Sequence, residues 1–394
     1  MPRKKQVACK FEDRSKYNEY GSKIGKRNNE QINATECDFR MIVGRRSNGK
    51  TYPTLVFDGI KNWIDTDGEE AFAYVRRWGD DLKDNAPQLF NGCISDGWLS
   101  WYSKGKWNNI TYYRRCWYLV KTDPETGEVK EKAKKPLAYA FALNQAERYK
   151  GPDYPMIKRI VFDEFIPEKK TQGYIPGEWK LWKSLMSTII RERTDVIVYM
   201  IANTISKACP YFDAYHIDID EVEAGTLATY KYSGGGTLAL EYCKDTGDTI
   251  VASSKYFEID DTGTGSMITK GEWETDLYPT LPRRLRHVDR TVFRFWICTG
   301  RDKVIQGNII ETNGPACVFF HRKTTPLQYR ESDYVYKESW DPEQMDNPLI
   351  RIGFNRNRNV DKIILDMIAN NRAFYSDNDT GDKVKMFLAT TNSR

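Results

Sequence analysis

Eight residues, 44–51, constrain the fold of this chain more than any other part of its sequence. They read Gly-Arg-Arg-Ser-Asn-Gly-Lys-Thr and fit the pattern G-x-x-x-x-G-K-[ST], in which backbone N–H groups of a glycine-rich loop surround phosphate oxygens. An apolar segment, residues 39–43, precedes the pattern, and a plausible helix with Pro53 in its first turn follows it. A strand, a loop and a helix in this order predict the phosphate-binding loop of an α/β sheet.

Each residue of this loop has an expected role. Lys50 reaches the β- and γ-phosphates of a nucleotide, and the hydroxyl of Thr51 is a ligand for Mg²⁺. The cradle consists of the loop residues before them: Gly44, Arg45, Arg46, Ser47, Asn48 and Gly49. We therefore expect ATP and Mg²⁺ as cofactors. The alternative, a glycine-rich surface turn with an accidental Lys-Thr pair, is disfavoured by the strand before it and the helix after it.

A second motif, residues 159–165, reads Arg-Ile-Val-Phe-Asp-Glu-Phe. It predicts a buried strand that ends in two adjacent carboxylates. In P-loop proteins an acid in the place of Asp163 holds the Mg²⁺ shell. Glu164, just beyond the strand, would orient and deprotonate the attacking water, which favours hydrolysis over nucleotide binding alone. Taken by itself, the segment would more often be a strand that ends in an acidic turn.

A third apolar strand, residues 196–202, ends at Asn203. A polar side chain at the tip of the strand after the paired acids can sense the γ-phosphate or position the water. An asparagine that only caps a turn explains this position equally well.

Charge and composition narrow the class of protein. The chain has 394 residues, enough for two or three domains, and a net charge of +5. Residues 1–27 carry nine basic against three acidic side chains, and residues 283–330 carry ten against three, which indicates polyanion contact at defined places. A solvated basic tail explains the first stretch equally well.

The cysteine and histidine pattern and the hydropathy exclude several other classes. Eight cysteines without a C-x-x-C pair and three histidines argue against a zinc site and against a disulfide framework. No apolar run is long enough to span a membrane, and the basic N-terminus lacks an apolar stretch. We expect a protein of a reducing cytosol that is neither secreted nor membrane-spanning.

The chain divides into four expected parts. Residues 1–37 form a basic arm that orders on a neighbour or partner, and residues 38–224 form the α/β domain. Residues 225–282, rich in glycine and threonine, form a lid or linker with helical turns near 238–243. In residues 283–394, three successive antiparallel strands and then helices predict a small α+β domain. Lys104 and Lys106, at a turn around Gly105, are candidates for DNA contact, with solvated turn lysines as the favoured alternative.

With these motifs on one chain, the sequence resembles the DNA-encapsidation ATPases of small short-tailed phages with protein-primed genomes. The resemblance spans roughly residues 38–390; its motifs are specific in the ATPase part and weak beyond it. It implies a P-loop NTPase of the additional-strand catalytic-glutamate type. Such proteins form rings, typically pentamers, that use ATP to drive double-stranded DNA through a portal into a preformed capsid. In the best-known members a structural packaging RNA docks the ring on the portal. The resemblance also implies a transient role in the host cell cytoplasm and absence from the mature virion.

The resemblance implies further site residues as well. The family supplies basic side chains across the subunit boundary to the neighbour's nucleotide. Arg191, at the end of the helix after the paired acids, matches this role, with Arg193 as the second choice, and Lys150 matches a lysine before the paired-acid strand. Ordinary compensation of the helix dipole is the alternative role for Arg191.

The family's C-terminal domain resembles a ribonuclease-H-like nuclease. The strand at residues 291–299 contains no carboxylate, although a two-metal nuclease needs acidic ligands on its central strands. We therefore expect a vestigial nuclease that binds nucleic acid without cutting it. Its expected contacts are the basic residues Arg283, Arg284, Arg286, Arg290, Arg294, Arg301 and Lys303.

Three other functions remain open at this point. A P-loop phosphotransferase would act on a small acceptor, which the Asp163-Glu164 pair disfavours. A nucleotide-dependent nucleic-acid-binding scaffold would release no phosphate. An active nuclease would nick DNA with Mg²⁺ or Mn²⁺, and we expect none.

Overall fold

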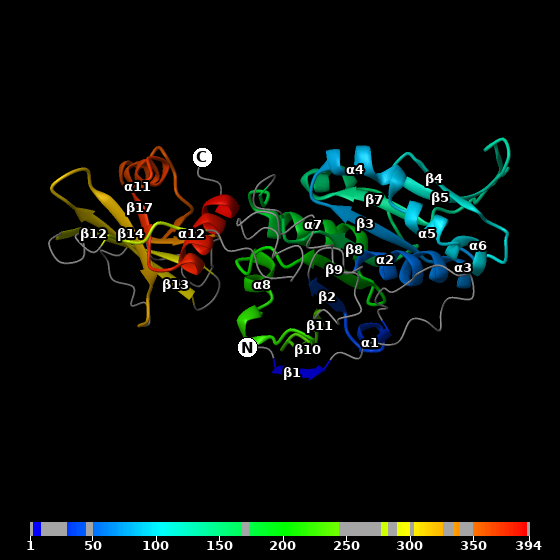
Figure 1. Cartoon of the computed structure of the whole chain (residues 1–394), viewed down its shortest axis with the longest axis horizontal. Helices are drawn as coiled ribbons and strands as arrows, with labels where there is room; N and C mark the ends of the chain where they lie inside the picture. The colour runs from blue at the N-terminus through cyan, green and yellow to red at the C-terminus, as the bar shows by residue number, and fades with distance from the viewer. Residues whose placement is uncertain are drawn as a thin grey trace, which may run out of the picture. The chain divides into compact units, whose positions relative to one another are not determined.

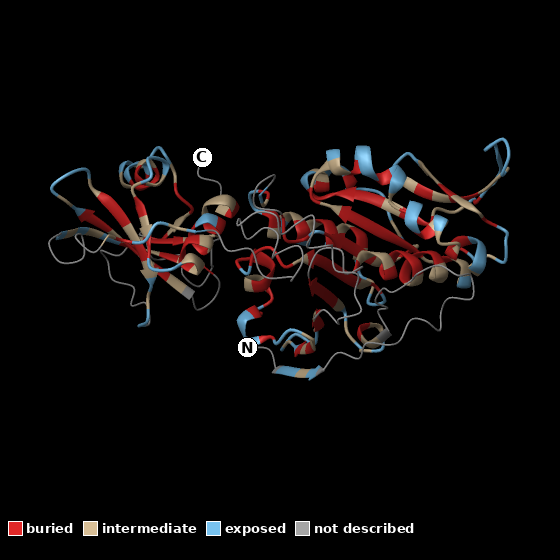
Figure 2. Ribbon diagram, in the orientation of Figure 1, coloured by how far each residue is buried: buried red, intermediate tan, exposed pale blue. Residues whose placement is uncertain are grey.

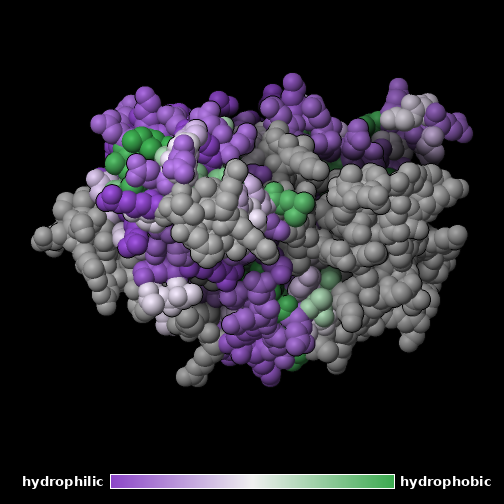
Figure 3. Space-filling view, turned by 60° about the vertical axis from the view of Figure 1, so that its left-hand side comes forward, coloured by the Kyte–Doolittle hydropathy of each residue, from purple (hydrophilic) through white to green (hydrophobic). Residues whose placement is uncertain are grey.

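The computed structural model describes residues 3–8, 30–44, 50–167, 173–243, 277–282, 290–299, 303–325, 334–338 and 350–391 (Figure 1). The chain divides into two compact units. The first comprises residues 1–167, 180–205 and 220–272, and the second comprises residues 168–179, 206–219 and 273–394. No helix among the described residues is long and apolar enough to cross a membrane. Hydrophilic side chains dominate the described surface on the side shown in Figure 3.

The first unit contains an eleven-stranded sheet in the order β1-β10-β11-β2-β9-β8-β3-β7-β5-β4, with β6 beside β5. In chain order its strands are β1 Arg3–Ala8, β2 Phe39–Gly44, β3 Ala71–Arg76, β4 Asn109–Tyr113, β5 Cys116–Thr122, β6 Val129–Lys132, β7 Ala138–Ala142, β8 Ile157–Asp163, β9 Ile197–Asn203, β10 Thr226–Lys231 and β11 Thr237–Tyr242. The central strands, from β11 to β7, are parallel. They are nearly continuously apolar and buried (Figure 2), as expected for a parallel sheet covered on both faces.

Helices cover the two faces of this sheet. The helical elements of the first unit are α1 Glu30–Asn33, α2 Thr51–Pro53, the π-helix η2 Thr54–Lys61, α3 Asn62–Asp65, α4 Gly79–Asn85, η3 Ala86–Gln88, α5 Asn91–Ser95, α6 Trp98–Tyr102 and η4 Leu143–Tyr149. Two more, α7 Glu178–Ile190 and η5 Ile219–Glu221, begin in the second unit and continue in the first. The continuous helical run from α2 to α3 packs on one face through Leu55, Val56 and Ile60. On the other face, Trp182 of α7 packs against Phe162 with 4.9 Å between ring centroids.

Two expectations about the first unit are wrong where the structure describes the chain. Residues 226–242 are no lid or linker, because they form the hairpin β10–β11, and β11 pairs in parallel with β2. The local composition did not indicate this hairpin. Gly235, with φ +88°, makes the hairpin turn, and the residues near Leu240, which favour a helix, form a buried strand. Residues 3–8 of the expected arm pair with β10 of the same chain instead of awaiting a partner. Residues 244–276 lie outside the described residues.

The second unit is built around a six-stranded mixed sheet in the order β16-β15-β12-β13-β14-β17. Its elements are α8 Pro210–Ala214, β12 Arg290–Thr299, β13 Lys303–Glu311, β14 Cys317–Arg322, β15 Tyr334–Lys337, β16 Ile350–Ile352, α11 Asn359–Ala369, β17 Ala373–Tyr375 and α12 Asn378–Thr391. The three expected antiparallel strands are β12, β13 and β14, and the helices expected after them are α11 and α12. Aromatic side chains fill the core, and Gly307 makes room for the ring of Phe295, since a Cβ there would lie 2.2 Å from it.

Candidate nucleotide-binding site

The carboxyl ends of three adjacent parallel strands bring the candidate residues together. In the sheet register Gly44 of β2 lies opposite Asn203 of β9, and Asp163 of β8 lies opposite Ile201 of β9. The loop that begins at Gly44 therefore leaves the sheet at the same edge as the paired acids and Asn203. This edge is where open α/β sheets bind their ligands.

Lys50 lies at this edge with its ammonium group held by two oxygen atoms. Its side chain is buried, and Nζ donates to the carbonyl of Gly44 (3.0 Å) and to Oδ1 of Asn203 (2.9 Å). The amide of Thr204 donates to the same Gly44 carbonyl (3.0 Å) and ties the two strand ends together. Asn203 thus contacts the P-loop lysine directly. Residues 45–49, the remainder of the expected cradle, lie outside the described residues.

Thr51 and Asp163 provide a pair of oxygen ligands suited to Mg²⁺. The Thr51 hydroxyl donates to Oδ1 of Asp163 (3.1 Å), and the Tyr74 hydroxyl donates to Oδ2 (2.8 Å). Burial raises the pKa of Asp163, while Arg76 and these two hydroxyl groups act in the opposite direction. A hydroxyl and a carboxylate held side by side match the hard oxygen donors that Mg²⁺ prefers, so the residues present fit this cofactor.

Glu164 occupies a backbone conformation that is rare for a non-glycine residue. Its φ is +57°, in the left-handed region. The buried guanidinium of Arg77 fixes this turn by donating to the carbonyls of Glu164 (2.9 Å) and Phe165 (2.8 Å). The turn directs the Glu164 side chain away from the strand, where it is 48% exposed.

Arg76 is a site residue that the sequence did not reveal. It ends β3, the neighbour of β8, and its Nη2 lies 2.6 Å from Oε2 of Glu164. The same guanidinium lies 3.8 Å from Asp163 and 3.7 Å from Asp81. Burial alone would lower the pKa of Arg76, but Tyr74 and the two neighbouring acids raise it above its ordinary value. A strand that ends in paired arginines, Tyr-Val-Arg-Arg at 74–77, is the only sequence signal of this residue.

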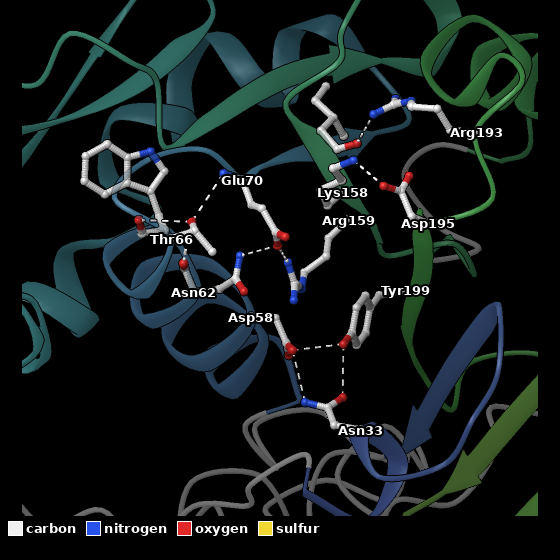
Figure 4. Close-up of polar contacts among 12 residues, drawn as sticks. Asn33, Asp58, Asn62, Thr66, Glu70, Lys158, Arg159, Arg193, Asp195 and Tyr199 are labelled. Carbon is white, nitrogen blue, oxygen red and sulfur yellow. Dashed lines mark hydrogen bonds and ion pairs between the residues drawn. The ribbon is translucent and has the colours of Figure 1, made fainter.

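A buried polar network anchors the helical run that follows the P-loop (Figure 4). Asp58 of η2 accepts hydrogen bonds from Asn33 of α1 (3.0 Å) and from the hydroxyl of Tyr199 on β9 (2.9 Å). Burial raises the pKa of this carboxyl, while the hydrogen bonds of Tyr199 and Asn33 and the nearby arginines counteract the rise. The network joins α1, the P-loop helix and the sheet.

The three candidates for a role in a neighbouring subunit lie away from this edge. Arg191 and Arg193 follow α7, in the connection that enters β9 at its amino end. The Arg191 guanidinium donates to the carbonyls of Gly151 and Pro152 (3.2 and 3.0 Å), just after Lys150, whose own ammonium pairs with Glu147 (2.7 Å). A seven-residue strand such as β8 spans about 20 Å, so Arg191 and Arg193 are separated from Lys50 by roughly that length.

Arg193 has extensive contacts within its own chain. Its guanidinium donates to the carbonyls of Pro155 (2.8 Å), Ile157 (2.7 Å), Ile190 (3.2 Å) and Ile189. These bonds join the end of α7 to the start of β8, beside the Lys158–Asp195 ion pair (Figure 4). They give Arg193 a structural role.

The described candidates for nucleic-acid contact are exposed. Lys104 has φ +51° in the turn with Gly105, and Lys106 lies with Nζ 5.2 Å from the ring centroid of Trp107. Arg290 and Arg294 are exposed on β12. Arg283, Arg284, Arg286, Arg301 and the side chain of Lys303 lie outside what the structure describes.

Comparison with known proteins relates this chain to DNA packaging proteins of phages. A family model described as Podovirus DNA encapsidation protein (Gp16) matches residues 130–224, which include β8, α7 and β9. The DNA packaging proteins of Bacillus phages phi29 and PZA are each 38% identical to this chain over 171 residues, which is 43% of this chain and 44% of each relative. The matched region therefore spans less than half the length of these relatives.

Solved structures show the same fold over nearly the whole chain. The structure entitled "The Phi-28 gp11 DNA packaging Motor" covers 93% of this chain and 98% of its own, with 16% identity and a TM-score of 0.57. "The bacteriophage Phi-29 viral genome packaging motor assembly" covers 92% and 98%, with 18% identity and a TM-score of 0.55. At these identities the similarity establishes a common fold.

Proposed function

We propose that this protein is an ATP-hydrolysing motor that moves double-stranded viral DNA into a preformed capsid as a homo-oligomeric ring. One observation carries the proposal: Lys50, Thr51, Asp163 and Glu164 lie at one edge of a parallel sheet, where a P-loop ATPase would bind ATP. The similarity to phage DNA packaging proteins supports DNA as the substrate, and its double-stranded form rests on the resemblance.

In this proposal each residue acts on ATP at a stated atom. Nζ of Lys50 binds the β- and γ-phosphate oxygens, and Asn203 orients that ammonium group. Thr51 and Asp163 would hold Mg²⁺, which neutralises charge that develops on the phosphates. The carboxylate of Glu164 accepts a proton from the attacking water, so ATP and water give ADP and phosphate.

The position of Glu164 must change during this cycle. In the structure its Oε2 pairs with the Arg76 guanidinium. Binding of water requires Glu164 to leave that contact. The left-handed backbone of Glu164, held by Arg77, fixes the turn about which the side chain moves.

The positions of the basic candidates and the resemblance both support a ring. Arg191 and Lys150 are exposed, and Arg191 is separated from Lys50 of the same chain by about one strand length, so it would serve a neighbour's nucleotide. Arg193 is less suited to this role because its guanidinium is occupied by carbonyls. The pentameric state, docking on the portal, a packaging RNA, and action in the host cytoplasm without retention in the virion rest on the resemblance.

For the second unit we propose a ribonuclease-H-like domain that binds nucleic acid without cutting it. The antiparallel strands β12–β14, with β15 parallel to β12, support that fold. β12 carries exposed Arg290 and Arg294 but no carboxylate. The buried Asp361 binds the Tyr336 hydroxyl (2.6 Å) and the Asn355 amide (2.8 Å), so its oxygens serve the fold.

Phosphate release from ATP, measured with and without duplex DNA, tests the function. We expect DNA to stimulate release by the wild-type protein and Lys50→Ala to abolish it. Glu164→Gln should still bind ATP but lose at least about a hundred-fold in rate. Glu125→Gln, at an exposed turn, is the matched control. Normal hydrolysis by Glu164→Gln would refute the assignment of the water-activating base. Stimulation of ATP turnover by a small acceptor would favour a phosphotransferase. If no phosphate were released, a nucleic-acid-binding scaffold would be favoured.

A further inference from the structure

Strands β4 and β5 extend the parallel sheet beyond β7 (Figure 1), and β6 pairs with β5. The side chains of this antiparallel region form two unlike faces. On one face Ile110 pairs with Leu119 and Tyr112 pairs with Trp117. Three of these side chains are buried in the core, and Tyr112 packs against the Trp117 ring with 4.8 Å between centroids. Because side chains alternate along a strand, the residues between them face the other way.

That other face carries tyrosine rings with cations above them. We call Tyr113, Arg114, Tyr118 and Lys132 the tyrosine face. Nζ of Lys132 lies 3.9 Å from the ring centroid of Tyr118 and 4.9 Å from that of Tyr113. The Arg114 guanidinium lies 5.1 Å from the Tyr113 centroid, and Tyr113 is 50% exposed.

The turn that presents Arg114 is held in place. Arg114 and Arg115 have φ of +49° and +63°, the conformation of a two-residue hairpin turn. Arg115 anchors the turn by donating to the Tyr149 hydroxyl (2.8 Å) and to Gln145 (3.0 Å). Arg114 is left exposed at the tip.

The cations of the tyrosine face differ from nearby lysines, because those lysines form ion pairs with carboxylates. Lys130 pairs with Asp123, and Lys135 pairs with Glu69. Among the described residues, Arg114 and Lys132 form no ion pair with a carboxylate. The surrounding segment, residues 104–135, has nine basic and four acidic side chains, so the local charge is positive. Unneutralised cations next to exposed rings match a ligand that offers both negative charge and flat rings.

We propose that the tyrosine face binds a single strand of nucleic acid, with an unpaired base stacked on Tyr113 and phosphates on Lys132 and Arg114. Base stacking on an aromatic ring tolerates any sequence, and the flanking cations follow the backbone. A duplex has its bases stacked internally and would leave the tyrosine rings unused. Neither stacking nor phosphate charge depends on the sugar, so DNA and RNA strands both qualify.

This inference goes beyond the proposed function, because translocation concerns duplex DNA and uses other residues. Strand β8 carries Asp163 and lies three strand spacings from β5, a distance of about 14 Å. Changes on the tyrosine face should therefore leave basal ATP hydrolysis unaltered. That rate reports folding and also separates failure of this inference from failure of the ATPase assignment.

The test is a titration of the full-length protein with fluorescent oligothymidylate, with oligouridylate and with a duplex of equal length. We expect tighter binding of the single strands than of the duplex, and about ten-fold weaker single-strand binding by Tyr113→Ala. Tyr113→Phe, which keeps the ring, should bind as wild type does. Lys132→Gln should weaken binding and lower its salt dependence by about one phosphate contact.

Lys130→Gln is the matched control, because it removes an equal charge from the same strand but from an existing ion pair. Single-strand binding that survives Tyr113→Ala unchanged would overturn the inference. Equal affinity for the single strands and the duplex would also overturn it. A stronger, Tyr113-dependent affinity for polyglutamate would overturn it as well and would identify an acidic protein as the ligand.

Discussion

Arg76 and Glu164 form an ion pair, 2.6 Å between Nη2 and Oε2, although 88 residues separate them in the sequence. The same guanidinium lies beside Asp163, the acid expected to hold Mg²⁺. Arg76 therefore connects Asp163, the proposed metal ligand, to Glu164, the proposed water-activating base. Its charge offsets the repulsion between two adjacent carboxylates, one of which is buried.

Removal of this cation should weaken Mg²⁺ binding. In Arg76→Ala, Asp163 would lose its counter-ion while burial and Glu164 still raise its pKa, so more of the carboxyl would be protonated. We expect the Mg²⁺ concentration for half-maximal ATP hydrolysis to rise roughly ten-fold, with a smaller rise in Arg76→Lys. Hydrolysis measured across a Mg²⁺ titration checks this. Superimposable curves for wild type and Arg76→Ala would contradict it.

Asn203→Asp should weaken ATP binding. The new carboxylate would lie where Oδ1 now accepts from Lys50 and would compete with phosphate for the ammonium group. We expect about a ten-fold loss of affinity for ATP, measured by calorimetry, and a smaller loss in Asn203→Ala, which adds no charge. Equal affinities for the two variants would show that Asn203 does not act through Lys50.

Substitutions of Arg191 and of Arg193 should have different effects on stability and on activity. Arg193→Ala removes the donor from the partly buried carbonyls of Ile157, Ile189 and Ile190, and it should destabilise the protein by about 1–3 kcal/mol in thermal or denaturant unfolding. Arg191 forms exposed contacts, so Arg191→Ala should cost less than about 1 kcal/mol. Mixed with wild-type subunits, Arg191→Ala should lower hydrolysis more than its own fraction predicts. A strictly proportional decrease would exclude a role in the neighbouring subunit.

Stability of the second unit should depend on pH through Glu338. Burial, with the nearby charge of Asp213, raises the pKa of Glu338 to about 7 from 4.5. The folded protein therefore binds a proton that the unfolded chain releases. This contribution, at most about 3 kcal/mol, is complete below pH 4.5 and is lost as pH rises through about 7.

Amide hydrogen exchange of the β12–β14 strands as a function of pH, corrected for intrinsic rates, measures this effect. Glu338→Gln, which stays neutral and can still accept from Thr390, should remove that part of the pH dependence. An unchanged pH profile in this variant would show that another group titrates.

Local patterns predicted much of the site and of the fold. The P-loop pattern placed Lys50 and Thr51, and an apolar run ending in two acids placed Asp163 and Glu164, because these features are encoded within a few residues. The helix that ends next to Arg191 and the three antiparallel strands of the second unit were also predictable from side-chain periodicity. The hairpin β10–β11 was not, because the glycine-rich turn and the Leu-Ala-Leu run carry no local sign of pairing with β2.

Local sequence encodes most of the strands and the residue types at their ends, although not the hairpin β10–β11. Which strand ends meet depends on the order of the strands in the folded sheet. Arg76 joins the site because β3 lies beside β8, and the tyrosine face exists because β4–β6 continue the sheet past β7. Strand order arises from contacts between distant segments that bury a shared core, and no short stretch of sequence contains that information.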